Sequence, residues 1–150
     1  INVEYVPTVP YSSEGVEMKN LVCIEDGKLK NMHANCRYAY YLGMKPTGVY
    51  SKISVQPGDM PFDDMKAHKG LYVVNFSDFQ MDSLSGFFGG EIRLAYYNDG
   101  EKIVPVTGGS VNGTIIDAQK DFEFSKETQE TSTFAGPKAI LLKDISVAGK

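Results

Sequence analysis

Histidine and cysteine are scarce in this sequence of 150 residues, which contains two of each. His33 and His68 lie far apart along the chain, and Cys23 and Cys36 have no second cysteine pair with which to form a zinc ribbon or a disulfide framework. No group of imidazole, thiolate and carboxylate side chains is therefore predicted to bind a divalent metal. We assign no catalytic residue and no metal ligand to this chain. We expect two free thiols, which favours a reducing compartment such as the cytoplasm.

Long apolar runs and an excess of positive charge are lacking as well. No stretch approaches the ~20 apolar residues that span a bilayer, and the amino end lacks the basic flank and apolar run of a signal peptide. The formal net charge is -4, the isoelectric point is near 5.1, and the fifteen basic residues are scattered. A nucleic-acid backbone would be repelled on average by such a chain. We therefore expect neither membrane insertion nor direct nucleic-acid binding.

Apolar runs separated by Asp-Gly and Asn-Gly turns predict two β-hairpins. The first surrounds residues 25–27, and the second joins strands over 91–97 and 102–106 through residues 98–100. Residues 1–15 read as an irregular segment or an edge strand, because their prolines cannot donate to a ladder. Further strands are predicted over 50–56, over 71–76 as a buried strand, and over 137–150.

Three short helices are predicted from apolar residues at helical spacing. They cover 34–42, which ends at a glycine, 61–70, with Asp59 as the N-cap and Gly70 as the stop, and 114–122. The glycine-rich segment before the third helix is predicted to be a turn, and the polar run 126–133 a mobile or solvated loop.

The sum of these elements is an α+β fold of mainly antiparallel β-sheet with two or three short helices. Composition supports the same class, because 42% hydrophobic and 23% charged residues fit a domain that buries a real core. We expect residues 1–150 to form a single domain. The chain begins without methionine in a turn-rich segment, so we also expect it to be a fragment of a longer protein.

Five segments, in their order along the chain, resemble the carboxy-terminal domain of the TldD/PmbA family, whose members were once described as modulators of DNA gyrase. The resemblance covers about residues 12–149, nearly the whole chain. The segments are SSEGVEMKNLVCIEDGKLKNM, YLGMKPTG, PGDMPFDDMKAHKGLYVVNF, SGFFGGEIRLAYYNDGEKIVPVTGGSVNG and GPKAILLKDISVAG.

Active members of this family are zinc peptidases, which bind the metal through an HExxxH motif on an upstream helix and a cysteine near the carboxy terminus. This chain has no HExxxH motif, and the region 122–137, which corresponds to the cysteine-bearing loop, contains no cysteine. The turn at 77–82 keeps Gln80 and Asp82 of the family pattern but lacks its glycines. The resemblance therefore implies a degenerate or non-catalytic subunit in peptide proteolysis or maturation. No cofactor is implied for this chain, and zinc remains an option for the full-length protein.

An unfolded peptide or protein is the substrate that the resemblance implies, and a TldD/PmbA-type subunit the partner, in a homo- or hetero-oligomer. Strand addition at a sheet edge would hold such a peptide by main-chain hydrogen bonds. Two turns are the predicted peptide-binding residues. They are Lys45, Pro46, Thr47 and Gly48 in the first turn, and Gln80, Met81 and Asp82 in the second.

Two alternatives stay open. One is an active zinc peptidase whose site is completed by upstream residues, or in which His33, Asp82 or Glu127 replaces the thiolate. The other is a structural or dimerisation domain without a substrate, which would use an apolar face made of aromatic residues. These aromatic residues are Phe87, Phe88, Tyr96 and Tyr97.

Overall fold

The structure is a computed structural model that describes residues 1–149. The chain divides into two compact units. Unit 1 contains Ile1–Gly58 and Glu127–Lys138, and unit 2 contains Asp59–Lys126 and the chain from Ala139 onward. Each unit has its own sheet and is described by itself.

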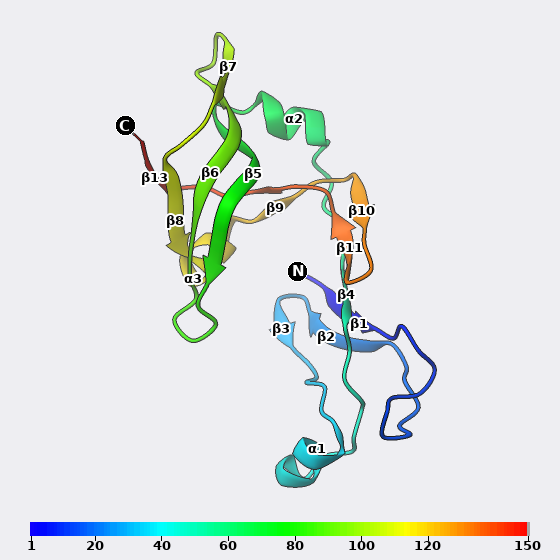
Figure 1. Cartoon of the computed structure of the whole chain (residues 1–150). Coiled ribbons are helices and arrows are strands. Elements are labelled where there is room, and N and C mark those ends of the chain that lie inside the picture. Colours follow the sequence, from blue (N-terminus) through cyan, green and yellow to red (C-terminus); the bar gives the residue numbers. More distant parts are fainter. Residues whose placement is uncertain (150) are drawn as a thin grey trace. The chain divides into compact units, whose positions relative to one another are not determined.

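Unit 1 is built on a six-stranded sheet in the order β10-β11-β4-β1-β2-β3 (Figure 1). All neighbouring strands are antiparallel except β11 and β4, which are parallel. The strands are β1 (Val3–Val6), β2 (Leu21–Glu25), β3 (Lys28–Leu29), β4 (Lys52–Val55), β10 (Thr128–Glu130) and β11 (Phe134–Pro137).

The first predicted hairpin is confirmed by the pairing of β2 with β3. The sequence predicts an irregular segment or an edge strand over residues 1–15, whereas Val3–Val6 form β1, which pairs with both β2 and β4 inside the sheet. β1 ends at Val6, just before Pro7, so the proline follows the strand and interrupts no ladder. The loop predicted over 126–133 is also wrong, since it contains β10, whose Glu130 forms an ion pair with Lys52.

The first predicted helix is confirmed as α1 (Cys36–Leu42). Asn35 is its N-cap and accepts a hydrogen bond of 2.9 Å from the backbone N–H of Tyr38, and Gly43 is its C-cap. The expected free thiols are confirmed as well. Cys23 is buried in β2, and Cys36 is exposed at the start of α1.

The turn Lys45–Gly48 packs against Ala34, which lies two residues before α1. Thr47 accepts a hydrogen bond of 2.9 Å at Oγ1 from the backbone N–H of Ala34, and the N–H groups of Thr47 and Gly48 donate to the Ala34 carbonyl at 3.0 and 3.1 Å. Gly48 has a φ of +83°, and a Cβ added there would overlap the sulfur of the buried Met18. Only glycine fits both the backbone conformation and the space at this position.

Unit 2 contains a five-stranded antiparallel sheet. Its strands run in the order β13-β8-β6-β5, and β7 also pairs with β6 (Figure 1). A two-stranded sheet pairs β9 with β12. The strands are β5 (Gly70–Met81), β6 (Phe87–Asn98), β7 (Ile103–Val106), β8 (Ser110–Thr114), β9 (Glu123–Phe124), β12 (Ile140–Leu141) and β13 (Ser146–Ala148). The buried centre of the sheet consists of Ile92, Ala95 and Val111.

The hairpin of β6 and β7 confirms the second predicted turn, but β5 and β6 are both longer than expected. Residues 77–81 belong to β5, so Gln80 and Met81 lie in a strand and not in a turn. β5 is half-buried to exposed along its length, whereas the sequence predicted a buried strand over 71–76.

Glycines explain why β6 begins earlier than predicted and why β8 was missed, since β8 lies where a glycine-rich turn was predicted. Gly90 of β6 faces two aromatic rings, because an added Cβ would lie 2.7 Å from a ring atom of Phe76 and 2.8 Å from one of Phe79. Gly113 of β8 faces Phe88 in the same way, at 2.9 Å. These glycines sit inside strands, where they give aromatic rings room on the sheet.

The helices of unit 2 are shorter than predicted. α2 (Phe62–Ala67) has Pro61 as its N-cap and His68 as its C-cap, so Asp59 and Gly70 do not have the roles that the sequence predicted. The third predicted helix is α3 (Ile115–Ala118) followed by the 3₁₀ turn η1 (Gln119–Asp121). The overall class is nevertheless the predicted one, α+β with mainly antiparallel sheet and few short helices.

The loop between β5 and β6 is held by one carboxylate. Asp82 accepts hydrogen bonds from the backbone N–H of Leu84 at 3.0 Å, from that of Ser85 at 3.3 Å, and from the Ser85 hydroxyl at 2.5 Å. These bonds, led by the one from the Ser85 hydroxyl, lower the pKa of Asp82 below its ordinary value. The Asp82 backbone also closes the loop, because its N–H donates to Phe87 and its carbonyl accepts from Gly86.

We expect Gly48→Ala to destabilise the protein by about 3 kcal/mol, the sum of a strained left-handed backbone and a steric overlap with Met18. Urea unfolding would measure the loss. Gly15→Ala is the matched control, because Gly15 has a similar φ of +75° but no neighbouring atom within 4 Å of an added Cβ. Equal losses in the two variants would contradict the packing role of Met18.

We expect Asp82→Asn to lower stability at neutral pH, because the ionised carboxylate is the better acceptor for the loop donors. The folded-state pKa of Asp82 is lowered, so its contribution is present above the unfolded pKa of about 3.9 and is lost as the pH falls through the folded pKa. Urea midpoints at a series of pH values should therefore converge for the two proteins in acid. Asp59→Asn serves as the control, and a gap that persists unchanged at low pH would refute this account.

Candidate functional site

The outer edge of β5 is the longest open strand edge in the described part of the chain. β5 is the last strand in the order β13-β8-β6-β5, and within residues 1–149 it pairs only with β6 (Figure 1). The other outermost strands of the two larger sheets, β13, β10, β7 and β3, are two to four residues long, whereas β5 has 12 residues. An open edge presents unpaired N–H and C=O groups with which another strand can pair.

Three of the predicted peptide-binding residues lie at the end of this edge. Gln80 and Met81 are the last residues of β5, and both are exposed. The Gln80 amide donates a hydrogen bond of 3.1 Å to the Asp78 carboxylate. Asp82 follows the strand, and its carboxylate is occupied by the loop donors described above. The structure therefore gives Asp82 a role in the hairpin loop, and a role of the three residues in peptide binding stays a prediction.

The other predicted segment, Lys45–Gly48, belongs to unit 1, so neither unit contains both predicted segments. Thr47 and Gly48 face inward and hold the chain against Ala34 and Met18. Lys45 and Pro46 are exposed and are the members of this segment that remain accessible to a ligand.

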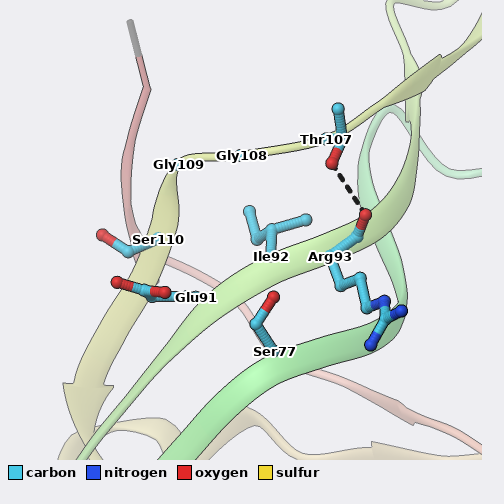
Figure 2. A pocket seen from close by; sticks show the side chains of 8 residues that line it. All are labelled: Ser77, Glu91, Ile92, Arg93, Thr107, Gly108, Gly109 and Ser110. Carbon is cyan, nitrogen blue, oxygen red and sulfur yellow. Dashed lines mark hydrogen bonds between the residues drawn. The ribbon is translucent and has the colours of Figure 1, made fainter.

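A polar depression of about 510 Å³ lies on the sheet of unit 2, and the sequence did not predict it. Ser77, Glu91–Arg93 and Thr107–Ser110 line it (Figure 2). The turn between β7 and β8 forms one wall and is fastened to β6. The Thr107 hydroxyl donates to the Arg93 carbonyl at 2.8 Å, and the Gly108 N–H donates to the Ile92 carbonyl at 2.9 Å. Only the two successive glycines of this turn hinted at it in the sequence.

The residues of this chain do not fit the zinc site that the resemblance implies for active relatives. Within residues 1–149, no group of three or more His, Cys, Asp or Glu side chains could hold a metal ion. Of the three residues considered as replacements for the thiolate, His33 and Glu127 belong to unit 1 and Asp82 to unit 2. No catalytic step is therefore derived through a metal.

His33 belongs to an aromatic cluster. Its ring packs edge-on against Tyr5 at 4.7 Å and against Tyr50 at 5.9 Å, and its buried Nδ1 has no hydrogen-bond partner among the described residues. Cys23 is hydrogen-bonded to the Tyr5 hydroxyl, which together with burial raises the pKa of Tyr5 to about 12. This cluster supplies packing and a protonated phenol, which is a poor metal ligand.

The aromatic residues considered for an assembly face do not act as one set. Phe88 is buried, with 6% of its surface exposed, whereas Phe87, Tyr96 and Tyr97 are each 40–48% exposed.

No helix within the described residues has the length and apolar character needed to cross a membrane.

A family model and a named relative both match this chain. The family model of the PmbA/TldA metallopeptidase C-terminal domain matches residues 4–149. A protein named metalloprotease from Methanothermobacter thermautotrophicus is 26% identical over 128 residues, which are 75% of this chain and 28% of that protein.

Solved structures share the fold at low sequence identity. TldE from Thermococcus kodakarensis has a TM-score of 0.82 at 16% identity and is covered over 39% of its length by 99% of this chain. A candidate modulator of DNA gyrase from Bacteroides thetaiotaomicron has a TM-score of 0.83 at 19% identity, over 99% of this chain and 36% of that one. A counterpart from Thermotoga maritima has a TM-score of 0.79 at 19% identity, over 98% and 39%.

The chain thus spans 28% of the metalloprotease relative and 36–39% of the solved chains. The family model covers nearly every residue, and the antiparallel sheets with few short helices are those of the solved relatives. The chain belongs to the PmbA/TldA metallopeptidase family, also called TldD/PmbA, and it corresponds to the carboxy-terminal domain of that family.

Proposed function

We propose that this domain is a non-catalytic part of a peptide-processing protein and that it holds an unfolded peptide along the outer edge of β5. The observation that carries this proposal is the open edge of 12 residues, Gly70–Met81. A peptide in extended conformation would form main-chain hydrogen bonds with this edge, and these bonds read little of the peptide's sequence. Such binding suits a protein that acts on disordered segments of varied sequence.

The region that would carry the metal-binding cysteine in active relatives supports a non-catalytic role. Residues 122–137 contain no cysteine, and they form β9, β10 and β11. Ser125 is fully buried in this region. Its hydroxyl accepts a hydrogen bond of 3.0 Å from the Ala139 N–H, and its own N–H donates to the Ala139 carbonyl at 3.0 Å. The segment is therefore occupied by strand pairing and packing.

Hydrolysis would then be supplied by another part of the assembly. The name of the archaeal relative, metalloprotease, supports a role near peptide cleavage, and this chain covers only 28% of that protein. We propose a homo- or hetero-oligomer with a TldD/PmbA-type subunit that carries the zinc. We also propose a cytoplasmic location, which the two free thiols support.

A second copy of the chain is the competing occupant of the β5 edge. The exposed aromatic residues Phe87, Tyr96 and Tyr97 lie on the neighbouring strand β6 and favour a contact with a second copy, because aromatic side chains are common in assembly interfaces. The experiment below separates the two, since a dimer would protect β5 without any added peptide.

We expect an unstructured peptide long enough to span β5 to bind and to slow hydrogen exchange at the amides of Gly70–Met81. The same peptide with alternate backbone nitrogens methylated should bind at least tenfold more weakly, because it loses two or more main-chain hydrogen bonds of about 1 kcal/mol each. Hydrogen-exchange mass spectrometry and fluorescence anisotropy would measure the two effects.

The short edge strand β13 is the internal control, because its amides should exchange at the same rate with and without peptide. Equal affinities for the two peptides would exclude strand addition. Protection of β5 that rises with protein concentration in the absence of peptide would favour the dimer instead.

We expect this chain to purify without stoichiometric zinc and to leave peptides uncleaved, because its described residues offer no group of three ligands. Elemental analysis and a peptide-cleavage assay, each repeated on the full-length protein, would test this. Zinc that remains bound to this chain at one equivalent, and that chelation removes together with cleavage activity, would establish the active-peptidase alternative.

A further inference from the structure

The pairing of β5 with β6 contains irregularities that lie beside the polar depression. Asn75 pairs with Leu94 and Phe76 with Ile92, which leaves Arg93 as an extra residue on β6. Asp78 then pairs with Glu91, which leaves Ser77 as an extra residue on β5. A β-bulge re-aims the side chain of its extra residue, and both extra residues line the depression.

The wall opposite these bulges is fixed in place. Gly108 and Gly109 have φ values of +78° and carry no side chains into the space. Hydrogen bonds run in both directions between the turn and Ile92, because the Gly108 N–H donates to the Ile92 carbonyl and the Ile92 N–H donates to the Gly109 carbonyl at 3.0 Å. The volume of about 510 Å³ is within the range of small-molecule sites.

Two opposite charges in this depression have no ion-pair partner among the described residues. Glu91 and Arg93 are both exposed, and neither takes part in any of the ion pairs within residues 1–149. In Figure 2 they lie on either side of Ser77, whose hydroxyl stands between them. An anion placed near Arg93 and a cation placed near Glu91 would therefore face the same hydroxyl from opposite sides.

We propose that this depression binds short peptides with free termini. Arg93 binds the terminal carboxylate through its planar fork of N–H donors, and Glu91 binds the terminal ammonium group. The Ser77 hydroxyl donates to the peptide carbonyl between them. A simple anion would leave its charge opposed by Glu91, and a simple cation would be opposed by Arg93, so a ligand with both charges satisfies the site best.

Length selects among such ligands. Glu91 and Arg93 lie on opposite sides of the Ser77 hydroxyl, so a ligand that contacts both charged groups must reach across it (Figure 2). The charged ends of an extended dipeptide are about 6–7 Å apart, whereas those of a free amino acid are only about 3 Å apart. A dipeptide can therefore reach across Ser77 better than a single amino acid can. The inference goes beyond the proposed function, because a dipeptide is too short to add a strand to β5.

The test is a set of NMR titrations of the intact chain with four ligands: the dipeptide Ala-Ala, its N-acetyl form, its carboxyl amide, and free alanine. We expect Ala-Ala to bind about tenfold more tightly than each of the others, because each of those loses one charge-assisted contact. The shifted signals should come from Ser77, Glu91–Arg93 and Thr107–Ser110.

Two charge-neutralising variants assign the roles. Glu91→Gln should weaken the binding of Ala-Ala about tenfold and leave the binding of the N-acetyl form unchanged. Arg93→Gln should weaken the binding of Ala-Ala about tenfold and leave the binding of the carboxyl amide unchanged. Glu101→Gln and Arg37→Gln, at an exposed glutamate and at the other arginine of the chain, are the matched controls and should change nothing. The amide spectrum of each variant confirms that it is folded.

The proposal is overturned if the blocked dipeptides or free alanine bind as tightly as Ala-Ala, or if neither variant weakens binding. It is also overturned if the shifts lie outside the depression. A dipeptide methylated at its single peptide nitrogen distinguishes this site from strand addition. If that ligand binds with unchanged affinity, binding in the depression is supported. If its affinity falls tenfold and the shifted signals lie along β5, the β5 edge alone binds peptides.

Discussion

The contact of aromatic rings with glycines on neighbouring strands is the constraint on which the sheet of unit 2 depends. The rings of Phe76 and Phe79 occupy the space that a side chain at Gly90 would need, and Phe88 does the same at Gly113. The rings also contact each other, with centroids 5.0 Å apart for Phe76 and Phe79 and 6.2 Å apart for Phe79 and Phe88. Such pairs contribute about 0.5–1.5 kcal/mol each beyond the area they bury. A side chain at Gly90 would therefore displace two rings at once.

The open edge and the polar depression are both consequences of the same pairing. Extra residues at Val74, Arg93 and Ser77 interrupt the ladder, so β5 has regular pairing only over 70–73 and 78–81. Bulges twist an edge strand and make indiscriminate edge-to-edge association harder. An extended peptide would therefore meet two short regular stretches on β5. The bulges that limit strand addition in this way are also those that turn Ser77 and Arg93 toward the depression.

The sequence was a good guide where a local rule decides the structure. Asn98–Gly100 closes a hairpin as predicted, and the helix predicted over 34–42 ends at Gly43 as expected, because turns and helix C-caps depend on a few adjacent residues. It was a poor guide inside β6 and β8. Local rules read the glycines there as a turn, but in the fold they leave room for aromatic rings from neighbouring strands. The depression depends on strand register, which no local pattern encodes, so Glu91 and Arg93 could not be singled out from the sequence.

The segments that carry the family resemblance mark the fold more than they mark a site. In the segment KPTG, Thr47 and Gly48 fasten the chain to Ala34 and Met18, and in the segment SDFQMD the Asp82 carboxylate holds a loop of its own hairpin. Each of these residues satisfies a neighbour within its own unit, so substitution would be felt as lost stability before lost binding. The side chains of Glu91 and Arg93, in contrast, take part in no ion pair within the described residues. Residues that do not stabilise the fold can change or bind a ligand without loss of stability. A family can therefore keep its sheet while its chemistry changes.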